Sequence, residues 1–254
     1  MENSDSYIIG RNAVMEALRS GQQIEKIFFC FGTQGPTISK IYSLAKRMKI
    51  PCTNLDKKKF ATLEKSIISI GGNSQGVIAL IRQIATFELK DMLQKSFINN
   101  SQPIIVALDN INDPHNLGAI ARSAECAGVC GMILPIRDSA PITPAAIKAS
   151  AGGLEHIKVT KVNNLTQALI TCKEAGFWII GTDSEVERYY TDNIYDRPVV
   201  LVIGSEGSGL RPGIRNQCDI IVKIPLLGKI PSLNASVTSG IILFEMLRQR
   251  DKIN

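Results

Sequence analysis

No apolar run in this 254-residue sequence approaches the roughly 20 residues that a bilayer-spanning helix needs. The first ten residues, MENSDSYIIG, are acidic and polar, whereas a secretory leader needs a basic start followed by an apolar stretch. Internal repeats and low-complexity tracts are also absent. These absences argue against a membrane protein, a secreted protein and a disordered chain. We therefore expect a soluble, cytoplasmic protein with a substantial core.

Paired cysteines are lacking as well. None of the six cysteines shows the C-x-x-C spacing of zinc and redox sites, and several lie inside apolar runs, where a free cysteine behaves as a small core residue. The sequence therefore predicts free thiols in a reducing compartment and no metal site.

Acidic residues are scarce in the first third of the chain. Residues 1–81 hold eleven Lys and Arg residues against six Asp and Glu residues, a surplus of five out of a net charge of +6 for the whole chain. A basic, separately folded N-terminal part suggests a polyanionic partner. A solvated basic surface with no such partner explains the charge about equally well.

Residues 7–81 alternate helical and extended patterns, which predicts a small α/β domain. Helices are expected at 12–20, 36–48 and 57–64, and strands at 24–31, 50–55 and 75–81. The basic residues cluster on the expected helices and could bind RNA phosphates. The candidates are Arg11, Lys46, Arg47, Lys57, Lys58 and Lys59.

The pattern changes after residue 81. Residues 82–102 are expected to form a linker, centred near 82–86, and a short helical segment at 88–97. From residue 103 to 254, short apolar runs alternate with helical patterns: IIVALD, GMILP, GFWIIGTD, PVVLVIG and DIIVKIP. Such alternation predicts a second α/β domain with a mainly parallel sheet covered on both faces.

The first candidate motif follows the strand expected at 104–108. After Asp109 comes a loop, and a helix is expected to begin near Leu117. Asn116 at the entrance of a helix is by default a capping residue. Arg122 lies in a small, apolar helical turn near the carboxyl end of a strand, where open α/β sheets bind ligands. An arginine in that place is suited to grip a phosphate or carboxylate.

The second motif is a buried strand, 199–204, followed by SEGSGL. Its glycines, Gly204, Gly207 and Gly209, give G-x-x-G-x-G, which differs from the dinucleotide fingerprint, and no Lys-Ser or Lys-Thr pair follows as in a P-loop. Neither NAD nor ATP is indicated. Glu206 stands among these glycines, and a carboxylate on a loop at a strand end is a candidate for chemistry.

The third motif is 224–250, IPLLGKIPSLNASVTSGIILFEMLRQR, a strand end, a polar loop and a long helix. Ser232 and Asn234 precede the helix and are by default N-capping residues. The helix is apolar on two sides, which predicts burial on both sides and a subunit interface. One stripe is Val237, Ile241, Phe244 and Leu247, and the other is Ile242, Leu243 and Met246.

Together, HNLGAIARSAE, VIGSEGSGL and IPLLGKIPSLNASVTSGIILFE resemble, in order and spacing, the three motifs of the SpoU (TrmH-type) family of SPOUT RNA 2′-O-ribose methyltransferases. YIIGRNAVMEAL and QGVIALI resemble the family's small L30e-like substrate-binding domain. This combination is most similar to bacterial guanosine 2′-O-methyltransferases of large-subunit ribosomal RNA. At 74–76 the sequence reads SQG, where relatives often have HQG.

The resemblance implies S-adenosylmethionine as methyl donor, ribosomal RNA as substrate, a C-terminal trefoil knot and a homodimer. Carried over by position, the cofactor pocket would be lined by Gly204, Ile224, Leu226 and Leu233. The catalytic positions would be Asn116, Arg122, Glu206, Ser232 and Asn234.

Three questions stay open at this point. A guanidinium normally stays protonated, so the general base could be Arg122, Glu206 or water. The substrate could be tRNA instead of rRNA, although tRNA enzymes of this branch generally lack the L30e-like domain. The chain could also be a non-catalytic RNA-binding assembly factor, against which the intact motif residues argue.

Overall fold

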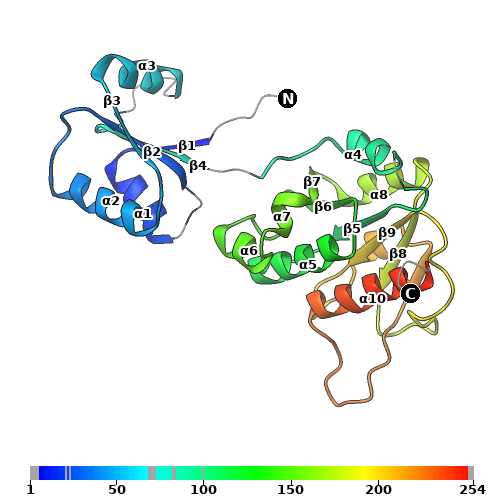
Figure 1. Ribbon diagram of the computed structural model, residues 1–254. Coiled ribbons are helices and arrows are strands. Elements are labelled where there is room, and N and C mark those ends of the chain that lie inside the picture. Colours follow the sequence, from blue (N-terminus) through cyan, green and yellow to red (C-terminus); the bar gives the residue numbers. More distant parts are fainter. Residues whose placement is uncertain are drawn as a thin grey trace. The chain divides into compact units, whose positions relative to one another are not determined.

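The computed structural model describes residues 6–20, 22, 24–67, 73–81, 84–98 and 100–250 (Figure 1). The chain divides into two compact units, Met1–Gln83 and Ile84–Asn254. The division lies between residues 83 and 84. Residues 1–5, 82 and 83, which carry parts of the leader and linker arguments, lie outside the described residues.

Unit 1 is a four-stranded sheet with the strand order β1-β4-β2-β3. Its elements are β1 (Ser6–Ile9), α1 (Arg11–Ser20), β2 (Ile24–Cys30), α2 (Pro36–Arg47), β3 (Cys52–Leu55), α3 (Lys57–Ile67) and β4 (Val77–Ile81). Strands β2 and β3 are parallel, and β4 runs antiparallel to β1 and β2. Val14, Ala17 and Leu18 are buried, as the helical period of α1 predicts. Strand β1 was not anticipated, because four residues carry too little pattern.

Unit 2 contains a six-stranded parallel sheet with the order β10-β8-β9-β5-β6-β7. The elements up to β7 are α4 (Leu89–Ser96), β5 (Ile104–Leu108), α5 (Pro114–Cys126), β6 (Gly131–Pro135), α6 (Pro144–Ala149), α7 (Gly153–His156) and β7 (Lys158–Val162). They are followed by α8 (Leu165–Glu174), β8 (Trp178–Thr182), β9 (Val199–Ile203), α9 (Pro212–Arg215), β10 (Ile220–Val222) and α10 (Ala235–Gln249). The predicted parallel α/β sheet is confirmed.

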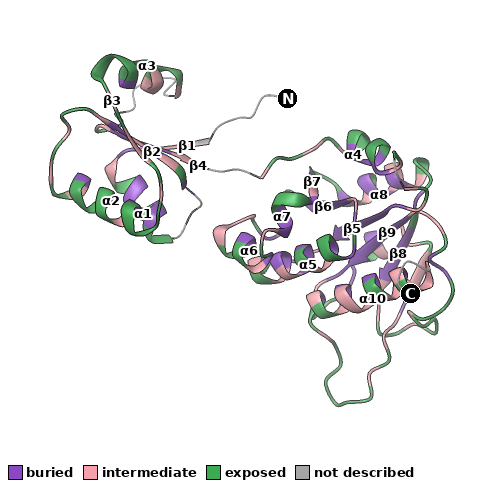
Figure 2. Cartoon of the chain, in the orientation of Figure 1, coloured by how far each residue is buried: buried purple, intermediate pink, exposed green. Residues whose placement is uncertain are grey.

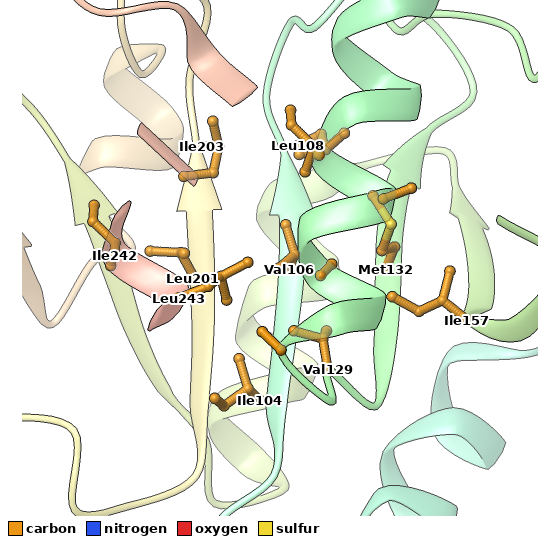
Figure 3. Close-up of a cluster of buried hydrophobic side chains, with 14 of the residues drawn as sticks. Ile104, Val106, Leu108, Val129, Met132, Ile157, Leu201, Ile203, Ile242 and Leu243 are labelled. Atoms are coloured by element: carbon orange, nitrogen blue, oxygen red, sulfur yellow. The ribbon is translucent and has the colours of Figure 1, made fainter. Parts of the chain in front are cut away.

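The central strands are buried on both faces because helices cover both sides of the sheet (Figure 2). Alternate residues of a strand point to opposite faces. Val106 and Leu108 of β5 pack with α5 and α10 on one face, as Figure 3 shows, whereas Ile105 and Ala107 pack with α4 and α8 on the other. The short helix expected at 88–97 therefore contributes core residues of unit 2, with Met92 fully buried.

Strand β7 was missed by the sequence patterns. Lys158 and Lys161 interrupt its apolar run, which is tolerated because β7 is an edge strand. Among the described residues, no helix is long and apolar enough to span a membrane. All six cysteines are free, and burial raises the pKa of the Cys172 and Cys218 thiols to about 12.

Helix α10 is anchored beyond its C-terminal end. Beyond its C-terminus, Arg250 donates hydrogen bonds to the carbonyl oxygens of Gln102, Tyr195 and Arg197 at 2.5, 2.7 and 2.6 Å. Burial lowers the pKa of Arg250 to about 10. At the other end of the helix, Asn234 and Ala235 contact Glu206, which follows the carboxyl end of β9.

Candidate functional site

The loop after β9 is folded tightly on itself. Ser205 and Gly209 exchange backbone hydrogen bonds of 3.2 and 3.0 Å, and Gly209 takes a positive φ of 63°. A Cβ on Gly204 would lie 2.4 Å from the carbonyl carbon of Gly209. The glycines thus serve the close approach of two backbone segments, and they present Glu206 at the tip of a compact loop.

Glu206 joins the three sequence motifs through one carboxylate oxygen. Its Oε1 accepts hydrogen bonds from Asn116 Nδ2 at 2.8 Å, Asn234 Nδ2 at 2.5 Å and the backbone N–H of Ala235 at 3.3 Å. Asn234 Nδ2 also lies 2.9 Å from Asn116 Oδ1. Among the described residues, no hydrogen bond to the second oxygen of Glu206, Oε2, is found. The carboxylate is therefore held in place with one oxygen available to a ligand.

Asn116 is not the cap of α5, contrary to its default interpretation. The helix begins at Pro114, three residues before the predicted start, and Asp113 is the N-cap, accepting from the His115 N–H at 2.9 Å. Proline is favoured in the first helical turn because its missing N–H is not needed there. Asn116 therefore lies within the first turn and uses its amide for the contact with Glu206.

Asn234 caps α10 and also contacts Glu206. Its Oδ1 caps α10 by accepting from the Ser236 N–H at 2.9 Å, while its Nδ2 donates to Glu206. Ser232 is exposed and does not cap the helix.

A cavity of about 490 Å³ opens beside Glu206, at the carboxyl ends of β8, β9 and β10. All four predicted cofactor residues line it: Gly204, Ile224, Leu226 and Leu233. Ser232 and Glu206 line it as well. The sequence patterns missed Thr182, Asp183 and Glu185, which also line the cavity. Their position at the carboxyl end of the strand GFWIIGTD could have indicated them, because parallel sheets bind ligands at the carboxyl ends of their strands.

Arg122 is not part of this cluster. It follows Asn116 by six residues, which places it about 9 Å further along α5 and roughly 120° around the helix. It is exposed, it does not line the cavity, and within the described part of the chain its guanidinium makes no hydrogen bond or ion pair. The structure therefore gathers four of the five predicted catalytic residues and leaves Arg122 free for a ligand.

The basic candidates of unit 1 fall into two groups. Arg11 begins α1 and Lys57, Lys58 and Lys59 begin α3, so these residues follow the carboxyl ends of β1 and β3. Lys46 and Arg47 are the last residues of α2, which precedes β3. They therefore lie near the amino ends of the parallel strands, opposite to the carboxyl ends. Arg11 Nε donates to the carbonyl of Gln75, in the SQG segment, at 2.9 Å. The two groups thus lie at opposite ends of the strands of this sheet.

Two family models match the chain. One, described as the SpoU rRNA Methylase family, matches residues 103–244, and the other, described as RNA 2′-O ribose methyltransferase substrate binding, matches residues 7–86. The chain belongs to the SpoU methylase family. A Bacillus subtilis (strain 168) relative, YacO, named for the TrmH family of tRNA/rRNA methyltransferases, is 35% identical over 253 residues, covering 100% of this chain and 99% of the relative. A similarly named Staphylococcus haemolyticus relative is 36% identical and covers 98% of both chains.

Solved structures give the same fold. An AdoMet-bound rRNA methyltransferase from Sinorhizobium meliloti matches with a TM-score of 0.61 and 26% identity, over 96% of this chain and 87% of that one. The SpoU methyltransferase AviRb from Streptomyces viridochromogenes matches with a TM-score of 0.63, at 22% identity, over 98% and 90%. A TrmH/SpoU tRNA modifying enzyme from A. aeolicus matches with a TM-score of 0.55 and 32% identity, over 65% and 85%.

These comparisons confirm the SpoU resemblance and the α/β fold, and with the family they confirm RNA 2′-O-methylation and S-adenosylmethionine as its methyl donor. RNA binding is supported for the N-terminal unit. The trefoil knot, the individual catalytic roles, the homodimer and the cytoplasmic location stay predictions. Within the described residues, no group of three or more metal-ligating side chains is found.

Proposed function

We propose that this SpoU methylase methylates the 2′-hydroxyl of a guanosine ribose in large-subunit ribosomal RNA, in the cytoplasm. The observation that carries the proposal is the hydrogen-bonded Asn116–Glu206–Asn234 cluster beside the cavity, which unites all three motifs in one site. The basic N-terminal unit, matched by the substrate-binding family model, favours a large structured RNA.

The cavity fits S-adenosylmethionine. Its volume, about 490 Å³, lies in the usual range for small-molecule sites. Ile203, Val222 and Ile242 offer an apolar surface for an adenine ring, and the carboxylate of Glu206 complements the positive charge of the cofactor. When bound, S-adenosylmethionine supplies the electrophilic methyl group.

The chain itself provides positioning and a proton acceptor. Asn116 and Asn234 hold Glu206 through Oε1, so Oε2 can accept the proton of a ribose hydroxyl directly or through one water. Fixing the hydroxyl in line with the methyl group supplies much of the rate enhancement. We assign to Arg122 the phosphate next to the target ribose, since a guanidinium stays charged and forms a planar fork.

Arg122→Ala should reduce kcat by about 100-fold, because the phosphate next to the target ribose loses its contact and the hydroxyl is no longer held in position. RNA affinity should change less than about 10-fold, since the remaining phosphate contacts persist. Methyl transfer from labelled S-adenosylmethionine and a filter-binding assay measure the two effects. Turnover near that of the wild type would contradict a role of Arg122 in methyl transfer.

The substrate is tested by mapping methylated riboses in RNA from cells with and without the protein. Loss of one guanosine methylation in large-subunit rRNA supports the proposal. Loss of a tRNA methylation supports the alternative, a tRNA substrate. The names of the relatives, which mention both tRNA and rRNA, are compatible with either substrate. Calorimetry with S-adenosylmethionine tests the third possibility, because a folded dimer that fails to bind it would be a non-catalytic RNA-binding factor.

We further propose a homodimer through helix α10. Ile242, Leu243 and Met246 are buried in the core, whereas Val237 and Phe244, on the other stripe, are 48% and 44% exposed. An apolar helix face left in water is typical of a subunit interface.

Phe244→Glu should therefore weaken dimerisation by at least about 30-fold, as expected for the loss of an aromatic interface anchor. Sedimentation velocity at micromolar concentration measures the mass. Ile98→Glu is the matched control, an exposed apolar residue of unit 2 outside α10. A wild-type protein that sediments as a monomer contradicts the proposed dimer.

A further inference from the structure

Asp109 is a buried charge at the carboxyl end of β5. It is fully buried, and among the described residues it is the only Asp, Glu, Lys, Arg or His that is. Its backbone N–H donates to the carbonyl of Ile203 at 2.9 Å, which extends the pairing of β5 with β9 by one residue. A buried carboxylate is retained only where its oxygens are satisfied, so its partners indicate what it holds.

Both oxygens of Asp109 are bound by one residue, Arg211. The backbone N–H of Arg211 donates to Oδ2 at 2.8 Å, and its Nε donates to Oδ1 at 2.7 Å. Arg211 is also the N-cap residue of α9, which starts at Pro212. The pair therefore ties the end of the 204–211 loop to strand β5, across 102 residues of sequence.

Glu206 lies in this loop, between Gly204 at the end of β9 and Arg211. Gly204 is packed against the backbone of Gly209 and Leu210, so the two halves of the loop cannot move independently. Neither Asp109 nor Arg211 lines the cavity beside Glu206. They can therefore influence the site only indirectly, through the two segments that they join.

We propose that the Asp109–Arg211 pair positions Glu206, and that both are positioning residues for methyl transfer. The inference rests on the proposed function in one respect, namely that Glu206 acts at the ribose. The pair fixes the loop to β5, the strand that leads into α5 and Asn116, so that Glu206 and Asn116 keep their relative positions.

Arg211→Ala is the test, with Lys173→Ala as the matched control. Lys173 and Asp219 form a second ion pair of unit 2, in which Asp219 also accepts from a backbone N–H: it binds Lys173 Nζ at 2.7 Å and the Ile179 N–H at 2.8 Å. The Lys173 and Arg211 side chains are similarly exposed, 34% and 43%. Arg211→Ala should lose more stability in thermal denaturation than Lys173→Ala, because Asp109 is fully buried whereas the Asp219 side chain is 29% exposed. Only Arg211→Ala should affect the loop.

The expected loss for Arg211→Ala is about 100-fold in kcat, the effect of misplacing a reacting group by about 1 Å. Millimolar methylguanidinium should restore part of it, since the side chain is accessible. In a Glu206→Ala background, Arg211→Ala should lower kcat by less than about 3-fold, because the effects of substituting residues that act through one another are not additive. A loss as large in that background as in the wild type, or none in the wild type, overturns the proposal.

Hydrogen exchange separates this inference from the proposed function. Amide exchange in 204–211 should rise at least about 10-fold in Arg211→Ala and stay unchanged in Lys173→Ala. Unchanged exchange in both variants contradicts the positioning role even if the enzyme is active. A wild-type protein that methylates no RNA refutes the proposed function, while faster exchange still supports the anchoring. Arg211→Lys, which keeps the charge and the backbone contact, replaces Arg211→Ala if that variant fails to fold.

Discussion

Glu206→Ala should lower kcat by about 1,000-fold and leave the fold intact. The carboxylate is exposed, so its removal costs little stability. The loss for catalysis is larger because Oε1 fixes Asn116 and Asn234, while Oε2 is the acceptor offered to the ribose hydroxyl. Removing one preorganised polar group from a reaction site typically lowers kcat by about 100- to 1,000-fold. Single-turnover methyl transfer with saturating S-adenosylmethionine measures the effect.

Glu206→Gln divides the two functions of the carboxylate. The amide oxygen of glutamine can still accept the three hydrogen bonds that Oε1 receives, but an amide is a poor proton acceptor. A glutamine variant as slow as the alanine variant identifies Glu206 as the proton acceptor, and recovery to within about 10-fold of wild type identifies a positioning role. Glu174→Ala, an exposed carboxylate on α8, is the control. Wild-type turnover in Glu206→Ala would contradict both roles.

The core of unit 2 could be predicted from sequence because its signal is local. Strands β5, β6 and β9 are short, wholly apolar runs, and such runs form parallel strands covered on both faces. The start of α5 was placed too late, although Asp113 and Pro114 carry the usual signals for a helix N-terminus. The difference affects the role of Asn116. Because the helix begins at Pro114, Asn116 lies inside the first turn, and its side chain donates to Glu206 instead of capping the helix.

The assembly of the site could not be derived from patterns. Asn116 and Glu206 are 90 residues apart, and Asn116 and Asn234 are 118 residues apart. Hydrophobic periodicity predicts elements and says nothing of which loops meet, so only the family resemblance placed these residues together. The Asp109–Arg211 pair was missed for the same reason. Its one local signal was a charged residue directly after an apolar strand.

Gly204→Ala should reduce kcat/KM for S-adenosylmethionine by about 1,000-fold, through a combined loss of cofactor binding and of Glu206 placement. An added Cβ would lie 2.4, 2.5 and 2.7 Å from the carbonyl carbon and oxygen of Gly209 and the amide nitrogen of Leu210. These are backbone atoms, so the clash cannot be relieved by a rotamer change and the loop itself must move. A displacement near 1 Å costs about 100-fold in rate, and overpacking costs a further 1–3 kcal/mol or so.

Gly207→Ala is the control within the same loop. A Cβ there meets no atom within 4 Å, and Gly207 does not have a positive φ, so alanine is compatible with its backbone. Gly207 also lines the cavity, but alanine adds only one methyl group there. We therefore expect S-adenosylmethionine affinity, measured by calorimetry, and turnover to change by less than about 10-fold. Equal losses in both variants would mean that the loop needs flexibility at every glycine. A loss confined to Gly204→Ala would mean that its role is the close approach of two backbone segments, which is what fixes Glu206 beside the cavity.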